Sequence, residues 1–377
     1  MVGFVMNQRF GTIFAVFFFL AFVFVPLQFD GFAWQNDVTL AIFSKPVAFL
    51  QELFFTDALA PVEFSSDTIA LNLLLVLLFV LAVGIGLVLR MKKFDTQRLV
   101  DFSRTIAVYY LAFVLLKYGF DKIFKAQFYL PEPNILYSLF GNLTKDTLYW
   151  STLGTSRTYC ILIGTVELAT GLLLLLTRTR VLGLLVAVVV LLQIVFINVG
   201  FDISVKTFSC LLLAATIFAV YPNLKSIYAF LIRQKTTQLP TDSQILKNEV
   251  LKIGFKTFAI GFLFLQVLYP FLASRNFNDD AQSRPFLHGA YEVISVVRAK
   301  DTIKEMGVSH LYIHRNDYLI LQRPDFGTTD YHFKLNRTKN QFVLEDYNRK
   351  KIIVDYRYHS NDSLLMLRFQ NQKEIEI

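Results

Sequence analysis

Cysteine is nearly absent from this chain of 377 residues, and its scarcity limits the chemistry that the protein can perform. The two cysteines, Cys160 and Cys210, lie in separate apolar segments without CxxC spacing. Such a pair provides neither a thioredoxin-like dithiol nor a thiolate zinc site. We expect both thiols to be small, buried, apolar residues.

Histidine is missing from the apolar part of the chain. All five histidines lie in the last quarter, at His288, His310, His314, His332 and His359. This distribution excludes a bis-histidine haem site and an imidazole-bound metal within a membrane. The five are scattered at the ends of expected strands without ligand spacing, so we expect them to be surface residues and predict no metal site.

Charged residues are also scarce, at 18% of the chain against about 25% in a typical soluble domain. Hydrophobic residues make up 54% and include 39 phenylalanines, a composition that indicates a membrane protein. The net charge of +8 would suit a nucleic-acid-binding protein. However, the basic residues fall beside apolar stretches, where membrane topology explains them, and no nucleic-acid-binding motif is present.

Seven stretches are long and apolar enough to cross a bilayer as helices, which takes about 20 residues each. They lie at residues 10–28, 69–89, 104–123, 158–177, 181–201, 204–221 and 253–273. The sequence therefore predicts an all-α membrane bundle of about seven transmembrane helices, with the lipid bilayer as a partner.

Lysine and arginine are distributed unevenly over the loops between these stretches. The loop between the first two stretches contains Lys45 among several acidic residues. The basic residues gather at the other ends of the stretches, at Arg9, Arg90, Lys92, Lys93, Arg98, Arg104, Arg178, Arg180, Lys225, Arg233, Lys235, Lys247 and Lys252. Because cytoplasmic loops carry an excess of Lys and Arg, this predicts a multi-pass protein of the bacterial inner membrane. Its N-terminus would be cytoplasmic and its C-terminal domain extracytoplasmic.

The composition changes abruptly after the segment "YPFLASRNFNDDAQSRP". From residue 287 onward, apolar and polar residues alternate in eight short runs, from "AYEVISVV" to "KEIEI", separated by polar turns such as "HRND" and "YHSND". Alternation of this kind predicts a small all-β antiparallel meander, closed into a barrel or folded as a sandwich. We expect residues from about 280 onward to fold as an independent unit.

Glu167 lies in the middle of an otherwise apolar stretch, "IGTVELATGLLLLL". An acidic side chain at the centre of a bilayer costs roughly 2.5–3.5 kcal/mol, so a partner must offset the cost. The simplest partner is Lys117 in the third stretch, or Lys122 nearer the surface. Gly164 and Gly171 flank Glu167 and would let a neighbouring helix approach closely.

Other polar residues gather in the outer half of the expected bundle. The candidate intramembrane site consists of Glu167, Lys117, Tyr118, Asp121, Lys122, Asn198, Asp202 and Lys206. Two interpretations stay open. The first is a structural ion pair that fixes helix register. The second is a proton-handling or ligand-binding site, open to the outer face, that accepts a quinone headgroup.

At these residues the chain resembles the DoxX family of four-helix membrane proteins. The similarity rests on "YGFDKIF", "GTVELATGLLLL" and "NVGFDISVK", and covers about residues 104–222. The resemblance implies a quinone-linked or thiol-linked membrane redox role, with Lys122 and Glu167 as the positions most like the family's shared polar residues. The chain departs from the family in one respect, because it has no redox-active dithiol, and this argues against a thiol-linked role.

This resemblance divides the chain into four parts. They are a two-span region at 1–103, a DoxX-like core at 104–232, a linker with the seventh span at 233–274, and a β-domain at 275–377. The leading hypothesis is an accessory, quinone-interacting subunit that works with a membrane or extracytoplasmic redox protein. The alternatives are a non-enzymatic scaffold, whose β-domain binds a ligand or partner, and a proton-coupled transporter. No inverted repeat or pair of broken helices supports the transporter.

Overall fold

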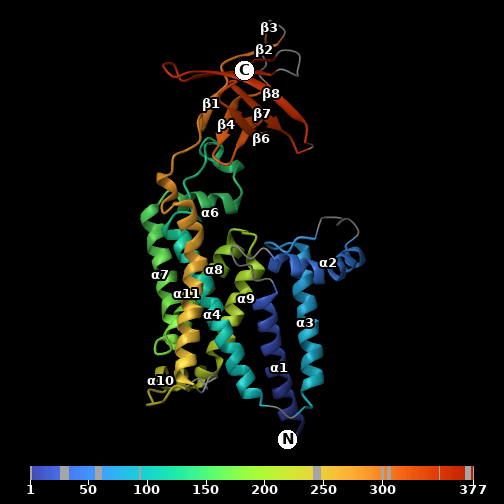
Figure 1. Ribbon diagram of the computed structural model, residues 1–377, viewed down its shortest axis with the longest axis vertical. Coiled ribbons are helices and arrows are strands. Elements are labelled where there is room, and N and C mark those ends of the chain that lie inside the picture. The colour runs from blue at the N-terminus through green and yellow to red at the C-terminus, as the bar shows by residue number, and fades with distance from the viewer. Residues whose placement is uncertain are drawn as a thin grey trace. The chain divides into compact units, whose positions relative to one another are not determined.

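The computed structural model describes residues 2–25, 34–55, 62–92, 95–240, 248–298, 301–303, 307–347, 349–369 and 375–376. It consists of a helical N-terminal region followed by an antiparallel β-sheet (Figure 1). By contact clustering, one unit contains residues 1–128 and 156–279, and the other contains residues 129–155 and 280–377. We call these the helical unit and the β unit.

The helical unit confirms the expected multi-pass architecture. Its long helices are α1 (Val2–Phe24), α3 (Ile69–Leu89), α4 (Thr96–Ile123), α7 (Arg157–Leu175), α8 (Arg180–Gly200), α9 (Lys206–Val220) and α11 (Glu249–Ser274). In the part of the chain that the structure describes, six helices are long and apolar enough to cross a membrane. The described apolar part of α1, Arg9–Phe24, is shorter, and residues 26–28 of the first expected span lie outside the described residues.

The third expected span begins earlier than its apolar residues indicate. Asp95 caps α4 by accepting hydrogen bonds from the N–H groups of Gln97 and Arg98. Such a cap satisfies backbone donors that the helix itself leaves unpaired. The helix therefore starts at Thr96, and the expected domain boundary at 103/104 falls within α4.

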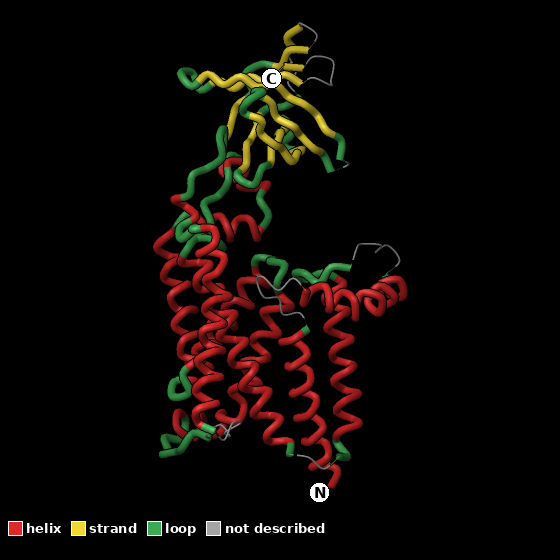
Figure 2. Tube along the Cα trace, viewed as in Figure 1, coloured by secondary structure: helices red, strands yellow, loops and turns green. Residues whose placement is uncertain are grey.

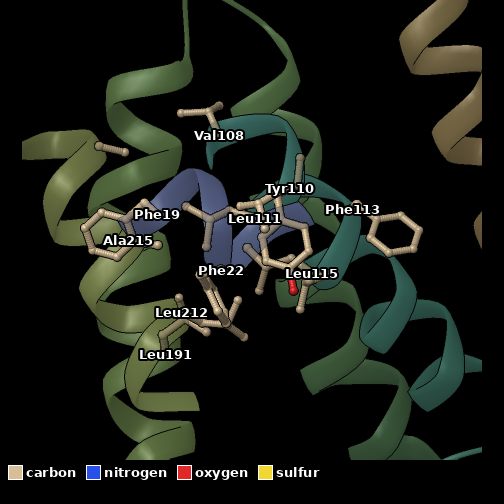
Figure 3. Close-up of a cluster of buried hydrophobic side chains, with 14 of the residues drawn as sticks. Phe19, Phe22, Val108, Tyr110, Leu111, Phe113, Leu115, Leu191, Leu212 and Ala215 are labelled. Carbon is tan, nitrogen blue, oxygen red and sulfur yellow. The ribbon is translucent and has the colours of Figure 1, made fainter. Parts of the chain in front are cut away.

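The core of the helical unit forms around α4, which is the most buried of the candidate spans. Phe22 of α1 meets Tyr110 of α4, Phe19 of α1 lies beside Ala215 of α9, and Leu212 of α9 belongs to the same cluster (Figure 3). The rings of Phe22 and Tyr110 lie edge to face at 5.7 Å, a favourable aromatic geometry. Since α1 packs into this cluster, it belongs to the same bundle as α4 and α9.

Further helices lie in the connections. They are α2 (Trp34–Phe54), α5 (Pro133–Leu136), α6 (Lys145–Gly154), α10 (Leu224–Leu231) and the 3₁₀ turns at Phe140–Asn142, Tyr221–Asn223 and Asp279–Ala281. Figure 1 shows α2 lying across the end of α3. Two of the candidate spans run on into such segments, since one extends from Lys206 through α10 to Leu231 and another from Glu249 to Ala281, whereas α2 is not among the candidates.

The β unit contains ten short strands in one antiparallel sheet (Figure 2). They are β1 (Gly289–Glu292), β2 (Val296–Arg298), β3 (Asp301–Ile303), β4 (His310–His314), β5 (Tyr318–Gln322), β6 (Thr328–Asn336), β7 (Gln341–Glu345), β8 (Lys351–His359), β9 (Leu364–Phe369) and β10 (Ile375–Glu376). Their order is β1-β4-β5-β6-β7-β8-β9-β10-β2-β3. The meander is confirmed for β4 to β10, while the expected run "AYEVISVV" is divided between β1 and β2.

The strand order shows that the sheet curls on itself. Strand β1 lies at one end of the order and β2 near the other, yet only residues 293–295 separate them in sequence. A chain of that length cannot cross a flat sheet of this many strands at about 4.8 Å spacing. The sheet is therefore barrel-like.

Both faces of the sheet bury side chains. One face forms the core of the β unit, with Leu311, Leu319 and Phe342 fully buried. On the opposite face, Tyr312 is also fully buried, and its ring lies 6.5 Å from that of Tyr137 in the 129–155 connection. Because α5 packs against β1 and β4, this connection covers part of the sheet. The expected β-domain of residues 275–377 is thus incomplete without residues 129–155.

Candidate functional site

The candidate site is built where α4 and α7 approach most closely. A Cβ atom on Gly119 would lie 2.9 Å from the carbonyl oxygen of Gly164, and one on Gly164 would lie 2.7 Å from that of Gly119. Neither position has room for a larger residue, because real Cβ atoms do not come this close to backbone oxygens. The two glycines therefore let the helix backbones touch, as small residues do between membrane helices.

Lys122 and Glu167, each three residues after its glycine on these two antiparallel helices, form an ion pair across this contact. The Lys122 Nζ atom lies 2.7 Å from Oε2 of Glu167, and their side chains are only 8% and 6% exposed. The ammonium group also lies 5.4 Å from the ring centre of Tyr118 and 5.7 Å from that of Phe128. Aromatic faces attract a cation, so the charge of Lys122 is held by a carboxylate and two rings.

This arrangement supplies the partner that Glu167 requires in an apolar helix. Each charge alone would be costly to bury, and the pair together with its short hydrogen bond offsets that cost. Of the two lysines expected as partners, Lys122 is the one that contacts Glu167. The pair can fix the register of α4 against α7. It can take part in proton transfer only if a ligand or another side chain comes within hydrogen-bonding distance of it.

The other predicted site residues are distributed over three further places. Lys117 and Asp121 are half-buried on α4, and the Asp121 carbonyl accepts the N–H groups of Ala126 and Gln127 where that helix ends. Asn198 is buried on α8, and its carbonyl oxygen accepts the N–H of Ile203. The structure therefore brings Lys122, Glu167 and Tyr118 together, with Asp121 near enough for its charge to act on Glu167 and Tyr118.

Asp202 and Lys206 form a separate ion pair at the start of α9. The Lys206 Nζ atom lies 2.6 Å from Oδ1 of Asp202, whose side chain is 78% exposed. The carboxylate of Asp67, from the segment before α3, accepts the backbone N–H groups of Lys206 and Thr207. An acidic group at a helix N-terminus satisfies unpaired N–H groups and favours the helix dipole. Asp67 therefore caps α9, and the Asp202–Lys206 pair lies beside this cap.

Sequence reasoning missed Lys125. Its side chain is fully buried, and its Nζ lies 3.9 Å from the Sγ of Cys160. Cys160 is buried as expected, whereas Cys210 on α9 is exposed, which corrects the expectation for that thiol. A helix can bury only one of its faces, and the apolar surroundings of Cys210 in the sequence do not reveal which.

A second polar cluster was missed in the β unit, around Glu132. Its Oε2 atom lies 2.9 Å from Nε2 of His288 and 3.9 Å from Nε2 of His314. Its Oε1 atom accepts from Nε of Arg315 at 3.2 Å, and the Arg315 guanidinium lies 3.8 Å from the ring centre of Tyr129. Glu132 is only 3% exposed. It therefore fastens the 129–155 connection to the ends of β1 and β4.

The cluster corrects the expectation that all five histidines are surface residues. The side chains of His288 and His314 are only 18% and 17% exposed. Burial is the main cause that lowers the pKa of His314, and the charges of Arg315 and His288 act in the same direction against the opposing charge of Glu132. Glutamate between two prolines in "LPEPN" was the sequence signal that could have pointed to this cluster.

A hollow of about 420 Å³ lies on the surface of α8. It is lined by one amide side chain, Gln193, and five apolar residues, Val189, Leu192, Phe196, Ile197 and Phe201. Its lining matches a molecule that is mostly apolar and carries a single hydrogen-bonding group.

Comparison with known proteins gives one informative similarity. The chain is 30% identical over 140 residues to the uncharacterized protein YwoB of Bacillus subtilis (strain 168), a match that covers 37% of this chain and 86% of that protein. No family model matches the chain. No solved structure matches it either.

Proposed function

The chain belongs to the same family as the uncharacterised Bacillus subtilis protein YwoB, and from that premise we propose that it is a non-enzymatic membrane scaffold. The helical unit, with a DoxX-like core, anchors the protein, and the β unit binds a partner. The relative's name assigns no function, so the proposal rests on geometry.

One observation carries the proposal, namely the covering of the β-sheet by residues 129–155. This segment joins α4 to α7, and Glu132 fastens it to His288 and Arg315 of the β unit. The chain therefore passes between the two units at three points, at 128/129, 155/156 and 279/280. A domain that served only as a loose tail would need one connection. The Lys122–Glu167 pair strengthens the α4–α7 contact from which the segment emerges.

Topology completes the proposal. The Lys and Arg asymmetry supports a cytoplasmic N-terminus and an extracytoplasmic β unit in a bacterial inner membrane. A reporter that fluoresces only in the cytoplasm, fused after residue 377, should remain dark. A bright fusion would contradict this orientation.

The scaffold proposal is tested by complex formation in native membranes. Complexes solubilised in mild detergent and separated on native gels should persist in the double variant Lys122→Met/Glu167→Gln, because the pair is only structural. They should be lost in Glu132→Gln, which releases the cover of the sheet. Loss in the double variant, with its unfolding temperature intact, would instead assign the pair a chemical role.

The hollow on α8 favours a second candidate, a quinone-interacting accessory subunit of a membrane redox system. Its five apolar residues fit a prenyl chain, and Gln193 offers an amide N–H to a ring carbonyl. Mass spectrometry of protein purified in mild detergent should then find a quinone, and Gln193→Leu should reduce it while Gln234→Leu, in an exposed loop, should not. Recovery of phospholipid alone would exclude this candidate.

A further inference from the structure

Helix α10 presents an apolar stripe at the end of the membrane bundle. It follows α9 through the turn Tyr221–Asn223, and Ile227 packs against the core of the helical unit. Phe230 is 63% exposed, and the adjoining side carries large apolar residues that are 41–70% exposed, namely Tyr221, Leu224, Tyr228, Leu231 and Ile232. Their spacing of three, four, three and one residues keeps them on one helical face. A face of this kind suits the boundary between lipid chains and headgroups.

Basic side chains border this stripe. Lys225 is exposed on α10, and Arg233 and Lys235 are exposed just after it. The chain folds back here, since the N–H of Lys235 donates to the carbonyl of Ala229 at 3.0 Å and Thr237 Oγ1 donates to that of Ser226 at 3.2 Å. These bonds keep Lys235 beside α10.

The charged residues of α10 and its return segment all have one sign. Arg233 holds its guanidinium 5.3 Å from the ring centre of Tyr228, which ties a cation to the apolar stripe. Residues 221–240 contain no aspartate or glutamate. An apolar face bordered by three cations and no anion is complementary to an anionic lipid surface.

We propose that α10 and its return segment, residues 221–239, form a binding surface for anionic phospholipids. The stripe inserts among the acyl chains, and Lys225, Arg233 and Lys235 contact the headgroup phosphates. The surface is continuous with the lipid-facing sides of the spans because α10 begins where α9 ends. This inference rests on a membrane location and is independent of the scaffold proposal, so either can fail alone.

Helix α2 provides an internal comparison at the opposite end of the bundle (Figure 1). It also exposes an apolar stripe, through Val38, Ile42, Phe49 and Leu53. Its charged residues, however, are Asp37, Lys45 and Glu52, a net charge of −1. A preference for anionic lipid is therefore expected at α10 and not at α2.

The test is native mass spectrometry of the full-length protein titrated with phosphatidylglycerol or phosphatidylcholine in detergent. The wild-type protein should retain phosphatidylglycerol preferentially. The triple variant Lys225→Gln/Arg233→Gln/Lys235→Gln should lose this preference by roughly fivefold per removed charge, the order expected for a basic side chain at an anionic surface. A matched variant, Lys339→Gln/Lys350→Gln/Arg357→Gln in the β unit, removes the same charge from exposed positions and should bind like the wild type.

Each other outcome overturns the proposal. Retained preference in the first triple variant would place the lipid elsewhere, and equal losses in both variants would show a general charge effect. Displacement of the lipid by inorganic phosphate at constant ionic strength would identify a simple anion site. A cross-link from Leu231→Cys to a second copy in membranes, in a chain otherwise free of cysteine, would assign the stripe to a protein interface.

Discussion

Lys122 of α4 pairs with Glu167 of α7 across the point where Gly119 of α4 touches Gly164 of α7. The two helices run in opposite directions, since Gly171 faces Ala112 and Leu116 whereas Gly164 faces Gly119 and Ile123, so the two charged residues lie on either side of the glycine contact. The close backbone approach brings the two charged side chains within 2.7 Å, and the pair in turn opposes sliding of one helix along the other.

Breaking this pair from one side should destabilise the helical unit. Glu167→Gln or Lys122→Met alone leaves a buried charge without its partner, at a cost of about 3–5 kcal/mol. Removing both charges together should recover most of that loss. Thermal unfolding in detergent, arranged as a double-mutant cycle, measures the coupling. The stability losses of Lys117→Met and Glu167→Gln should add up in the double variant. Additive losses for Lys122→Met and Glu167→Gln would contradict the pairing.

The glycine contact makes a separate prediction. In Gly119→Ala the new Cβ would lie 2.9 Å from the Gly164 oxygen and the Leu168 nitrogen, so the helices must move apart. Such overpacking typically costs about 1–3 kcal/mol. Gly84→Ala on α3, where the added atom meets only open space, is the control and should keep or raise the unfolding temperature. Equal unfolding temperatures for the two variants would show that the crossing can relax.

Glu132 should hold the 129–155 connection on the sheet. Glu132→Gln removes the carboxylate charge of Glu132 from beside the Arg315 guanidinium, whose side chain is 13% exposed. Hydrogen–deuterium exchange should then increase in α5, β1 and β4. The exposed Glu345, whose carboxylate lies 3.9 Å from Lys351, is a control, because a surface pair contributes about 0–1 kcal/mol. Unchanged exchange in Glu132→Gln would mean that apolar contacts alone hold the cover.

Much of the architecture could be predicted from local sequence patterns. Long apolar runs identified α3, α7 and α8 closely because a helix needs a minimum apolar length to span a bilayer. Alternation identified β4 to β9 because successive side chains on a strand face opposite sides. Helix α10 was not predicted, because its apolar stripe is short and interrupted by polar residues.

The partners of individual residues were harder to predict, because they depend on contacts between distant segments. The sequence indicated that Glu167 needs a cation and named two, but helical spacing alone could not decide between Lys117 and Lys122. Glu132 and His288 are 156 residues apart, and no local pattern connects them. For the same reason, the β-domain was expected to fold without the 129–155 connection.

The cover makes a prediction about fragments. Residues 280–377 alone should unfold at lower urea concentration than the same fragment joined by a flexible linker to residues 129–155. The isolated sheet would expose Tyr312 and Gln322, which are 0% and 2% exposed in the full chain. Far-ultraviolet circular dichroism against urea measures both midpoints. Equal urea midpoints for the two fragments would mean that the β-domain begins near residue 280 and does not need residues 129–155.

His314 should make the stability of the β unit depend on pH. Its pKa in the folded protein is held below the ordinary value chiefly by burial. Between that pKa and the unfolded value of about 6.5, the unfolded chain binds more protons, so stability falls as pH is lowered. The slope can reach about 1.4 kcal/mol per pH unit from this one group.

Urea unfolding between pH 7.5 and 5.5 tests this dependence in the full-length protein. The chain has two tryptophans, so in a Trp34→Phe background the fluorescence of Trp150 reports on the β unit alone. His314→Gln should flatten the dependence because the side chain can no longer be protonated. His359→Gln, at the exposed end of β8, should leave it unchanged. A slope that survives in His314→Gln would assign the effect to another group of the Glu132 cluster, and a reversed slope would show that Glu132, not burial, dominates the pKa of His314.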